Sequence, residues 1–296
     1  MAVAEQPSSK MPKPRLDGYK ILSLAGTGAK AHIYLAENEA GERFAIKHVL
    51  CEDKSGESGV RQVTAEHEVS SKFTHPNLRR SFEIHVRKKW MRVTEVILVM
   101  EFVEGEELQN YAKDRELPEL VAAFLQAARG LRAMHQAGLV HADLKPQNIL
   151  VNQAGVVKII DFGQSCKIGT AKPKRQGTPD YIPYEQYHCM ELDPRSDVFS
   201  LGATIYQVLT GEPMTTEMNK QLNEHHAAAQ VTRKPQRETP WEGVDLPPIL
   251  LKLIEDCCQN ERNNRPRNIG EVIARLELIE ASLARRAAAG GGAPAE

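Results

Sequence analysis

Four polar residues near the middle of the chain are of the types that phosphate chemistry uses. Asp143, Lys145, Asn148 and Asp161 provide two carboxylates, an amine and an amide within residues 139–163. Carboxylate and amide oxygens can hold a divalent metal ion against phosphate oxygens, while a second carboxylate accepts the proton of a hydroxyl group. The stretch therefore predicts metal-dependent phosphate chemistry.

Two short apolar runs must position these side chains. Residues 148–151 and 156–160 have the composition of small strands, and a polar loop precedes the first of them. We expect the polar side chains to converge at one edge of these strands.

A lysine earlier in the chain is a second candidate. The alternation of residues 43–50 places Lys47 on the same side as small and apolar neighbours. An inward ammonium group needs a partner, because a buried unpaired charge is costly. Glu66 and Glu68, in the helix-compatible stretch 60–73, could each be that partner. A solvated surface lysine is the alternative.

A glycine-bearing turn is predicted near the start of the chain, at residues 25–31, with a strand on each side. Because a strand follows the turn, a hairpin is favoured over a dinucleotide-binding strand–turn–helix. Backbone amides of such a turn can lie over phosphates, and glycine permits the close approach. A hairpin without a ligand stays open as the alternative. The turn residues concerned are Ala25, Gly26, Thr27 and Gly28.

The composition describes a folded chain without a global charge preference. With 296 residues and 41% hydrophobic residues, the chain can bury a substantial core. The 38 Lys and Arg residues balance 39 Asp and Glu residues, so we expect no nucleic-acid partner. The five cysteines show no C-x-x-C spacing and indicate neither a disulfide framework nor a zinc site. No stretch has the apolar length of a membrane helix or signal peptide, and we expect a cytoplasmic location.

Strand signals dominate the first hundred residues and helix signals the remainder. This division predicts two lobes joined near Glu104, with a cleft between them. A buried strand is predicted at residues 93–103. Helices are predicted at residues 117–135, 196–209, 248–258 and 268–279.

Two polar segments lack this periodicity. Residues 167–175 are basic and are predicted to form a mobile loop. For residues 214–242 we expect a surface helix and loops, and not a metal site at His225 and His226.

Taken in order, these motifs resemble those of the eukaryotic-type serine/threonine protein kinases, over roughly residues 19–280. The resemblance implies an α+β, two-lobed protein-kinase-like fold with a small β-rich N-lobe and a larger helical C-lobe. An ordered set of this kind does not arise by chance. The matching motifs are Gly26-x-Gly28 with Ile33, Ala45-Ile46-Lys47, Glu66 ahead of His75-Pro76-Asn77, His141-x-Asp143-Leu144-Lys145-Pro146-x-Asn148, Asp161-Phe162-Gly163, Gly177-Thr178-Pro179, Asp197-x-x-Ser200-x-Gly202 and Arg265-Pro266.

The resemblance also implies domain limits. The expected parts are a disordered leader at 1–17, a kinase domain at 18–280 with its N-lobe at about 18–103 and its C-lobe at about 106–280, and a disordered Ala/Gly tail at 281–296.

The same resemblance implies a role for each polar residue, with ATP and magnesium as cofactors and manganese as a possible substitute. Lys47 pairs with the α- and β-phosphates and is held by Glu66, whose spacing to the His-Pro-Asn motif fits the family. Asp143 accepts or orients the substrate hydroxyl, and Lys145 steadies the transferred phosphoryl group. The metal ligands are Asn148 and Asp161.

Adenine is expected among apolar side chains and beside the hinge. The backbone of Glu101 and Val103 would bond the base, and Met100 would be the gatekeeper behind it. Glu107 falls where kinases often contact ribose or a basic substrate residue. The apolar residues above and below the base would be Ile33, Ala45 and Leu150.

Lys145 and the Gly177-Thr178-Pro179 segment imply serine or threonine, in protein substrates, as the acceptor. The activation segment would cover residues 161–185. Its last residue, Glu185, would be buried against Arg265 as a structural pair.

Four positions depart from the family pattern. Ala31 replaces the third glycine of the loop, Ser70 takes a usually apolar helix position, and Tyr184 replaces the usual proline before Glu185. Ala142 stands where many kinases have an arginine that grips a phosphorylated activation loop. We therefore expect a kinase of the type that lacks this arginine, which includes bacterial members. The activity of such a kinase would not require loop phosphorylation.

Two other functions share parts of this pattern. A pseudokinase scaffold would bind nucleotide and partners, but that class usually lacks at least one residue of the set Lys47, Glu66, Asp143, Asn148 and Asp161. A small-molecule phosphotransferase of the aminoglycoside or choline kinase type shares the His-x-Asp loop. It lacks the Lys-Pro pair after that loop, the Gly-Thr-Pro segment and the helix opened by Asp197.

Overall fold

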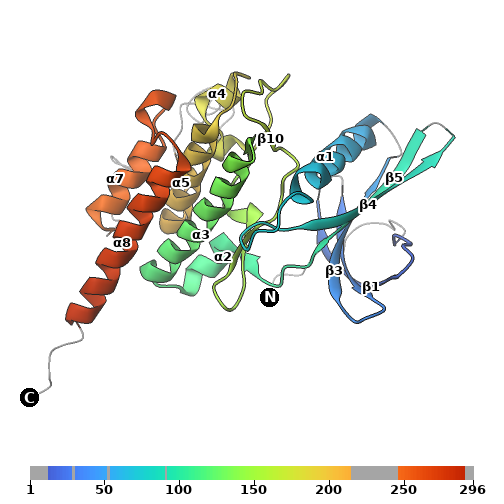
Figure 1. Ribbon diagram of the computed structural model, residues 1–296, viewed down its shortest axis with the longest axis horizontal. Coiled ribbons are helices and arrows are strands. Elements are labelled where there is room, and N and C mark those ends of the chain that lie inside the picture. The colour runs from blue at the N-terminus through green and yellow to red at the C-terminus, as the bar shows by residue number, and fades with distance from the viewer. Residues whose placement is uncertain (1–12, 29–30, 52–53, 91, 215–245, 291–296) are drawn as a thin grey trace, which may run out of the picture. The chain divides into compact units, whose positions relative to one another are not determined.

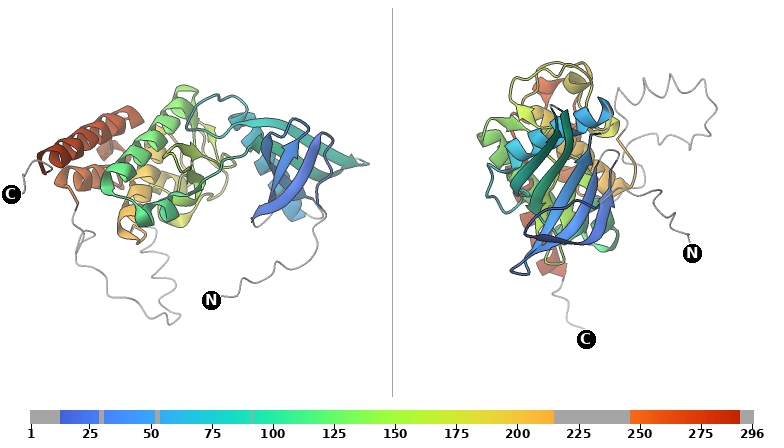
Figure 2. Two further views of the ribbon diagram at one scale, coloured as in Figure 1. Left: turned by 90° about the horizontal axis from the view of Figure 1, so that it is seen from below. Right: turned by 90° about the vertical axis from the view of Figure 1, so that its right-hand side faces the viewer.

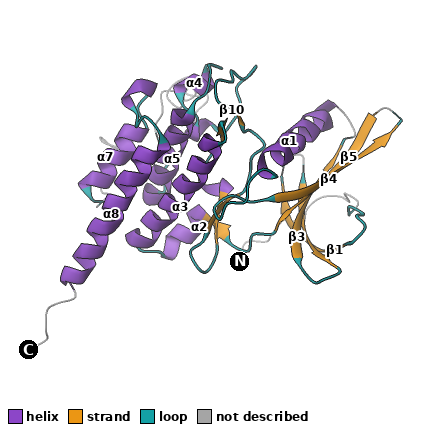
Figure 3. Ribbon diagram, in the orientation of Figure 1, coloured by secondary structure: helices purple, strands orange, loops and turns teal. Residues whose placement is uncertain are grey.

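The computed structural model describes residues 13–28, 31–51, 54–90, 92–214 and 246–290. The chain forms two compact units, and strands dominate the first while helices dominate the second (Figure 3). The units consist of Met1–His67 with Ser81–Phe102, and of Glu68–Arg80 with Val103–Glu296. The kinase-like α+β fold predicted from the sequence is confirmed. Segment 68–80, which we expected in the N-lobe, belongs to the second unit.

A five-stranded antiparallel sheet forms most of the first unit, in the order β1-β2-β3-β5-β4 (Figure 1). Helix α1 (Lys54–Ser70) lies along one face of the sheet (Figure 2). On that face Val63 belongs to the same apolar cluster as Ala45 and Val49. Ile46, of opposite parity on β3, belongs to a second apolar cluster, as strand alternation requires. The strands are β1 (Tyr19–Thr27), β2 (His32–Asn38), β3 (Arg43–Leu50), β4 (Ser81–Lys89) and β5 (Arg92–Glu101).

The turn between β1 and β2 is shorter than predicted. Strand β1 continues to Thr27, so Gly26 and Thr27 pair with Ile33 and His32 of β2, and Ala25 lies at a β-bulge just before them. The turn closes through a hydrogen bond from the Gly28 N–H to the Ala31 carbonyl at 2.8 Å. Expecting a turn from residue 25 was wrong because strand pairing extends through the small residues.

The second unit contains most of the helices, and two small sheets accompany them, in the orders β6-β8-β9 and β10-β7. Its longer helices are α3 (Leu117–Gln136), α5 (Pro194–Thr210), α7 (Pro248–Cys257) and α8 (Ile269–Gly290). Its shorter elements are β6 (Glu106–Glu107), α2 (Leu108–Tyr111), β7 (Leu139–Val140), β8 (Ile149–Val151), β9 (Val157–Ile159), β10 (Cys166–Lys167) and α4 (Tyr184–Tyr187).

Helix α3 supplies the central part of the second unit's core. Its predicted apolar stripe is buried, with Phe124, Leu131 and Met134 fully enclosed. The helix begins with a capping box in which the side chains of Glu116 and Glu119 each accept from the other's backbone N–H. Helices α5, α7 and α8 complete the same cluster, so the core packs around the elements that carry the candidate site.

The two ends of the described chain are more ordered than predicted. Pro14 is buried and Leu16 pairs with Tyr19, so residues 13–17 belong to the first unit and not to a disordered leader. Helix α8, which we expected to end near residue 279, continues to Gly290 because its last turns are rich in alanine and arginine. Residues 1–12 and 291–296 lie outside the described residues.

The basic segment at 167–175 also departs from prediction. Lys172 is only 8% exposed and donates to the backbone oxygen of Gln164, so this loop is anchored at its middle. Most of segment 214–242, with its His pair, lies outside the described residues. No described helix combines the length and apolarity that a bilayer crossing requires.

Candidate active site

Lys47 is paired within the first unit. Its ammonium nitrogen donates to Glu66 Oε2 at 2.6 Å, and the Glu66 side chain is fully buried while 13% of the Lys47 side chain is exposed. Glu68 is exposed. The ion pair joins β3 to α1, so Lys47 is not a solvated surface lysine, and of the two candidate glutamates the structure pairs it with Glu66.

Apolar residues expected near adenine gather beside this pair. Ile33 lies opposite Lys47 in the β2–β3 register, and Ala45 lies opposite Met100 in the β3–β5 register. Ile33, Ala45 and Met100 share one apolar cluster, and Met100 is fully buried. Glu101 ends β5 and is half-buried. The first unit thus brings the predicted gatekeeper and two of the three predicted adenine contacts together.

In the second unit, a buried carboxylate fixes the loop that leads to Asp143. Asp197 accepts hydrogen bonds from the backbone N–H groups of His141 and Ala142 at 2.8 and 2.9 Å, and from His135 Nε2 at 2.8 Å. Burial alone would raise the pKa of Asp197, but these hydrogen bonds and the nearby imidazoles outweigh it and hold the pKa below its ordinary value. The charged Asp197 therefore orders the loop.

His141 is fully buried next to Asp143. Burial lowers the pKa of His141 despite the neighbouring carboxylates, which favours the neutral ring. Its Nδ1 accepts from the Asp143 N–H at 3.2 Å, so the ring proton sits on Nε2. The ring also meets Phe162 edge to face, with centroids 5.7 Å apart.

Asp143, Lys145 and Thr178 contact one another. Asp143 Oδ1 accepts from the Thr178 N–H at 3.0 Å and from its hydroxyl at 3.1 Å. Lys145 Nζ donates to the same hydroxyl oxygen at 2.8 Å and lies 3.7 Å from Asp143 Oδ2. The carboxylate and the ammonium are both partly exposed, so a hydroxyl-bearing substrate could reach them.

Asn148 and Asp161 lie at the same end of the β8–β9 pair. The Asn148 carbonyl accepts from the Ile160 N–H at 3.0 Å, which places Asp161 one residue beyond this contact. Asn148 Nδ2 donates to the Asp143 carbonyl at 2.8 Å. With its nitrogen engaged, the amide oxygen of Asn148 is the atom suited to a metal. One Asp161 oxygen accepts from the Gly163 N–H at 2.9 Å.

These two residues fit a magnesium ion chemically, since both offer hard oxygen ligands. Among the described residues, no group of three or more His, Cys, Asp and Glu side chains could hold a metal ion by itself. A metal at Asn148 and Asp161 would thus depend on further oxygens, such as those of a phosphate chain, to complete its coordination.

The remaining predicted contact residues of the second unit lie along β6 and β8. Glu107 is exposed and pairs in register with half-buried Leu150. Val103 is half-buried just before β6. The structure therefore places Glu107 and Leu150 on adjacent strands.

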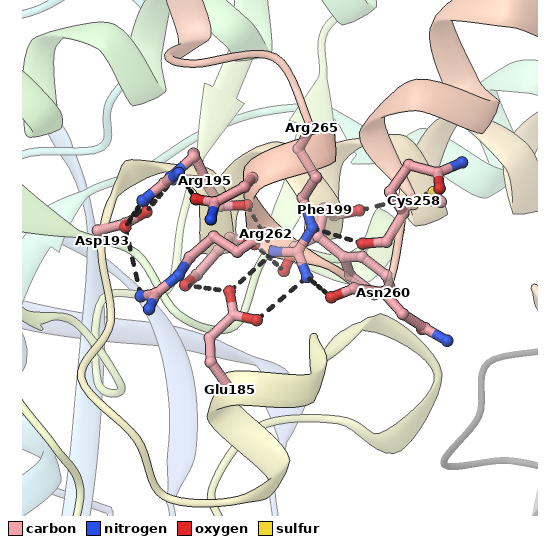
Figure 4. A network of polar contacts seen from close by, with 12 residues as sticks. Glu185, Asp193, Arg195, Phe199, Cys258, Asn260, Arg262 and Arg265 are labelled. Atoms are coloured by element: carbon pink, nitrogen blue, oxygen red, sulfur yellow. Dashed lines mark hydrogen bonds and ion pairs between the residues drawn. The ribbon is translucent and has the colours of Figure 1, made fainter.

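Glu185 and Arg265 form the buried pair that the sequence predicted (Figure 4). Two hydrogen bonds join them, Nη1 to Oε1 at 2.8 Å and Nη2 to Oε2 at 3.1 Å, and the side chains are 3% and 0% exposed. Ser196 also donates to Glu185, at 2.8 Å. Arg265 further donates to three backbone oxygens and lies over the Phe199 ring. The pair fixes the end of the activation segment against α5.

The four departures from the family pattern have different surroundings. Ala142 is buried and has a positive φ of 61°, whereas Ser70 is fully buried at the end of α1. Ala31 packs on the apolar cluster around Ala45. Tyr184 is half exposed and contacts the His188 ring, with centroids 4.1 Å apart and planes tilted by 39°.

Sequence reasoning missed three polar residues that support the site. His135 holds Asp197, Lys172 anchors the activation segment, and Gln186 bonds the Ala142 and Gln176 carbonyls, which precede Asp143 and Thr178. The His135–Asp197 and Gln186–Ala142 contacts span 62 and 44 positions, whereas Lys172 and Gln164 are eight positions apart. No local pattern signals such contacts.

A lysine–glutamate ion pair in a β-rich unit, and an Asp143 loop followed by Asn148 and Asp161 in a helical unit, are the arrangement of the protein kinase class. The sequence profile of the protein kinase domain matches residues 19–274. The chain therefore belongs to the protein kinase domain family, which implies ATP and a divalent metal as cofactors.

Known relatives are serine/threonine-protein kinases by name. PknA of Mycobacterium tuberculosis is 32% identical over 248 residues, which is 80% of this chain and 55% of that protein. A probable serine/threonine-protein kinase of Clostridium perfringens is 28% identical over 272 residues, 88% of this chain and 38% of that protein. Aurora kinase of Dictyostelium discoideum is 32% identical over 215 residues, which is 70% of this chain and 54% of that protein. The chain thus matches only about half, or less, of each relative's length.

Proposed function

We propose that the chain transfers the γ-phosphate of MgATP to serine or threonine hydroxyl groups of protein substrates. The observation that carries the proposal is the contact set of Asp143, Lys145 and Thr178, which places a carboxylate and an ammonium group around one hydroxyl oxygen. The Thr178 hydroxyl occupies the kind of position that an acceptor hydroxyl needs, next to a base and a cation.

In this proposal, Lys47 and the β1–β2 turn bind the phosphates. Lys47 is held in place by Glu66 and carries the positive charge. An added Cβ would lie no closer than 3.9 Å to a neighbour at Gly26 and 3.5 Å at Gly28, which is ordinary contact. The protein's own packing therefore does not require glycine there. In this proposal, glycine is needed there because it lets a phosphate chain approach the backbone closely.

Asn148 and Asp161 would hold the metal ion, which neutralises charge on the phosphates when bound. Asp143 then accepts or orients the acceptor hydroxyl, and Lys145 stabilises negative charge on the transferred group. Because Thr178 already bonds Asp143, its hydroxyl helps to fix the carboxylate's orientation. The chemistry required of the protein is mostly positioning and charge neutralisation.

The proposal includes activity without activation-loop phosphorylation. Ala142 is buried with Val140 and Leu192, and offers no positive charge to a phosphate. The loop is instead held by backbone bonds, from Gly169 to Leu192 at 2.8 Å and from Leu192 to Thr170 at 3.1 Å. Treatment with a phosphatase should therefore lower phosphotransfer less than tenfold. A larger loss would contradict this part of the proposal.

Substitution of Asp143 tests the reaction. Asp143→Asn should keep the Kd for ATP within a few fold and reduce phosphotransfer by at least about 100-fold, the scale of a positioned base. The measurement is transfer of labelled phosphate to a generic protein substrate and to a panel of Ser, Thr and Tyr peptides. Asp114→Asn makes the same chemical change at an exposed site and should act like the parent protein.

Three results would reject the proposal. Near-parental turnover in Asp143→Asn would exclude that residue as the base. ATP binding without turnover in the parent protein would favour a pseudokinase scaffold. Transfer to small alcohols but not to proteins would favour a small-molecule phosphotransferase.

A further inference from the structure

Gln186 lies on the short helix α4, one residue beyond Glu185. Its side chain is only 2% exposed, although glutamine is seldom fully buried. The backbone here is fixed by the Glu185–Arg265 pair and by a hydrogen bond from the Gln186 N–H to the Pro183 carbonyl at 3.1 Å. The amide group is therefore held where it is.

The side-chain nitrogen of Gln186 links two segments. It donates to the Ala142 carbonyl at 2.7 Å and to the Gln176 carbonyl at 2.8 Å, which uses both N–H groups. Both neighbours are carbonyl oxygens and accept only, so the contacts themselves fix which amide atom is nitrogen. The amide oxygen has no hydrogen-bond partner in the described part of the chain.

The two linked carbonyls lie close to Asp143 and Thr178 in the sequence. Ala142 directly precedes Asp143, and Gln176 precedes Thr178 by two positions. Between these anchors lies the contact in which Asp143 Oδ1 accepts from the Thr178 N–H and hydroxyl. One amide group thus holds both sides of the Asp143–Thr178 contact.

The backbone around the link is adapted to it. Ala142 has a φ of 61°, a left-handed conformation that is unfavourable for alanine, and its N–H is held by Asp197 while its carbonyl is held by Gln186. Gly177 has a φ of 102°, and a Cβ there would lie 2.6 Å from Gln186 Nε2. Only glycine lets the amide come this close.

We propose that Gln186 is a positioning residue for phosphotransfer, which orients Asp143 and Thr178 through the Ala142 and Gln176 carbonyls. This inference rests on the proposed kinase function. The link is uncharged and contains no phosphate. It orders the site by neutral hydrogen bonds.

Two substitutions of similar size test the link. Gln186→Glu places carboxylate oxygen against the two carbonyls and turns both attractive contacts into repulsive ones. Gln186→Leu keeps the volume and removes the donors without adding charge. For both we expect kcat to fall between about tenfold and 100-fold, with the KM for MgATP within threefold, because misplacement by a fraction of an ångström affects the reacting geometry.

Gln186→Glu has a pH signature that a loss of packing lacks. A protonated carboxyl group regains one O–H donor, and burial raises the pKa of the introduced glutamate. The activity of Gln186→Glu relative to the parent protein should therefore rise as the pH is lowered from 8 to 6. The corresponding ratio for Gln186→Leu should stay flat. Gln153→Glu, the same change at an exposed glutamine, should match the parent throughout.

Hydrogen exchange of the Thr178 amide separates this inference from the kinase function. The Thr178 N–H donates to Asp143, so losing the link should speed its exchange at least tenfold in the full chain. The inference is overturned if both variants keep kcat within twofold, or if exchange of the Thr178 amide is unchanged. It is also overturned if the fall in kcat comes with a large loss of ATP affinity and a lower melting temperature, because general unfolding would then explain it. If the parent protein transfers no phosphate, the proposed function fails, while Thr178 exchange still decides on the link.

Discussion

Removing one partner of the buried Glu185–Arg265 pair should have a cost that depends on which partner is removed. In Glu185→Gln, the Arg265 guanidinium keeps its bonds to the backbone oxygens of Gln259, Asn260 and Arg195 but loses its counter-charge. Arginine does not give up its proton in a folded protein. The free energy of unfolding should therefore fall by about 3–5 kcal/mol at any pH from 5 to 8.

Arg265→Met leaves a carboxylate, which can escape its isolation by taking up a proton. Uptake costs about 1.4 kcal/mol for each pH unit above the ordinary titration of glutamic acid near pH 4.3. The isolated charge can therefore lower the free energy of unfolding by at most about 3.7 kcal/mol at pH 7 and about 1 kcal/mol at pH 5. The folded variant holds this proton more tightly than the unfolded chain, so its deficit shrinks as the pH falls.

Urea unfolding followed by circular dichroism at pH 5, 6 and 7 measures both effects. The deficit of Arg265→Met should shrink by up to about 2.7 kcal/mol from pH 7 to 5, while that of Glu185→Gln stays constant. The double variant should be less destabilised than the sum of the two. Glu277→Gln, which breaks an exposed ion pair with Arg129, should cost less than about 1 kcal/mol. A deficit of Arg265→Met that is equal at pH 5 and 7 would refute the reasoning.

Three further outcomes follow from the structure. Lys47→Met should lower phosphotransfer by at least about 100-fold in a labelled-phosphate assay, because the proposed function assigns this cation to the phosphates of ATP. Asp197→Asn should be less stable than the parent at pH 6 in urea unfolding. Hydrogen bonds outweigh burial and keep the pKa of Asp197 in the folded protein below its ordinary 3.8, so the difference in stability should disappear as the pH falls through this lowered pKa. Burial raises the pKa of Cys257 to about 12, so a thiol reagent at pH 8 should label half-exposed Cys51 and Cys189 but leave buried Cys257 unlabelled until unfolding, as timed mass spectrometry can show.

The parts of the site that could be predicted are those with local patterns. Alternation on one strand placed Lys47 beside small and apolar neighbours but left a solvated lysine open. The resemblance to protein kinases implied its pairing, and motif spacing selected Glu66 as the partner. Residues two apart on a helix point to nearly opposite sides, so burial of Glu66 leaves Glu68 exposed, as observed. Likewise, a short apolar run on each side of a turn was enough to predict the strand pair that carries Asp161.

The parts that could not be predicted depend on contacts between distant segments. Gln186 bonds Ala142 across 44 positions, and His135 bonds Asp197 across 62. Glutamine and histidine are common surface residues, so neither residue type indicates burial. Lys172 was assigned to a mobile loop because of its charge, but its ammonium group satisfies a backbone oxygen inside the fold. Polar composition therefore predicted an exposed loop, although Lys172 forms a buried hydrogen bond there.

The apolar surroundings of Ala142 limit how this kinase domain could evolve. An arginine at that position would enter a space that is 1% exposed and lined by Val140, Leu192 and Cys166. The buried Asp197 carboxylate beside it already accepts three hydrogen bonds, so the new charge would add to the cost of burial. A lineage could therefore acquire phosphate-dependent control here only after other substitutions had opened the cluster. If the proposed independence from loop phosphorylation holds, such control is more than one mutational step away from this sequence.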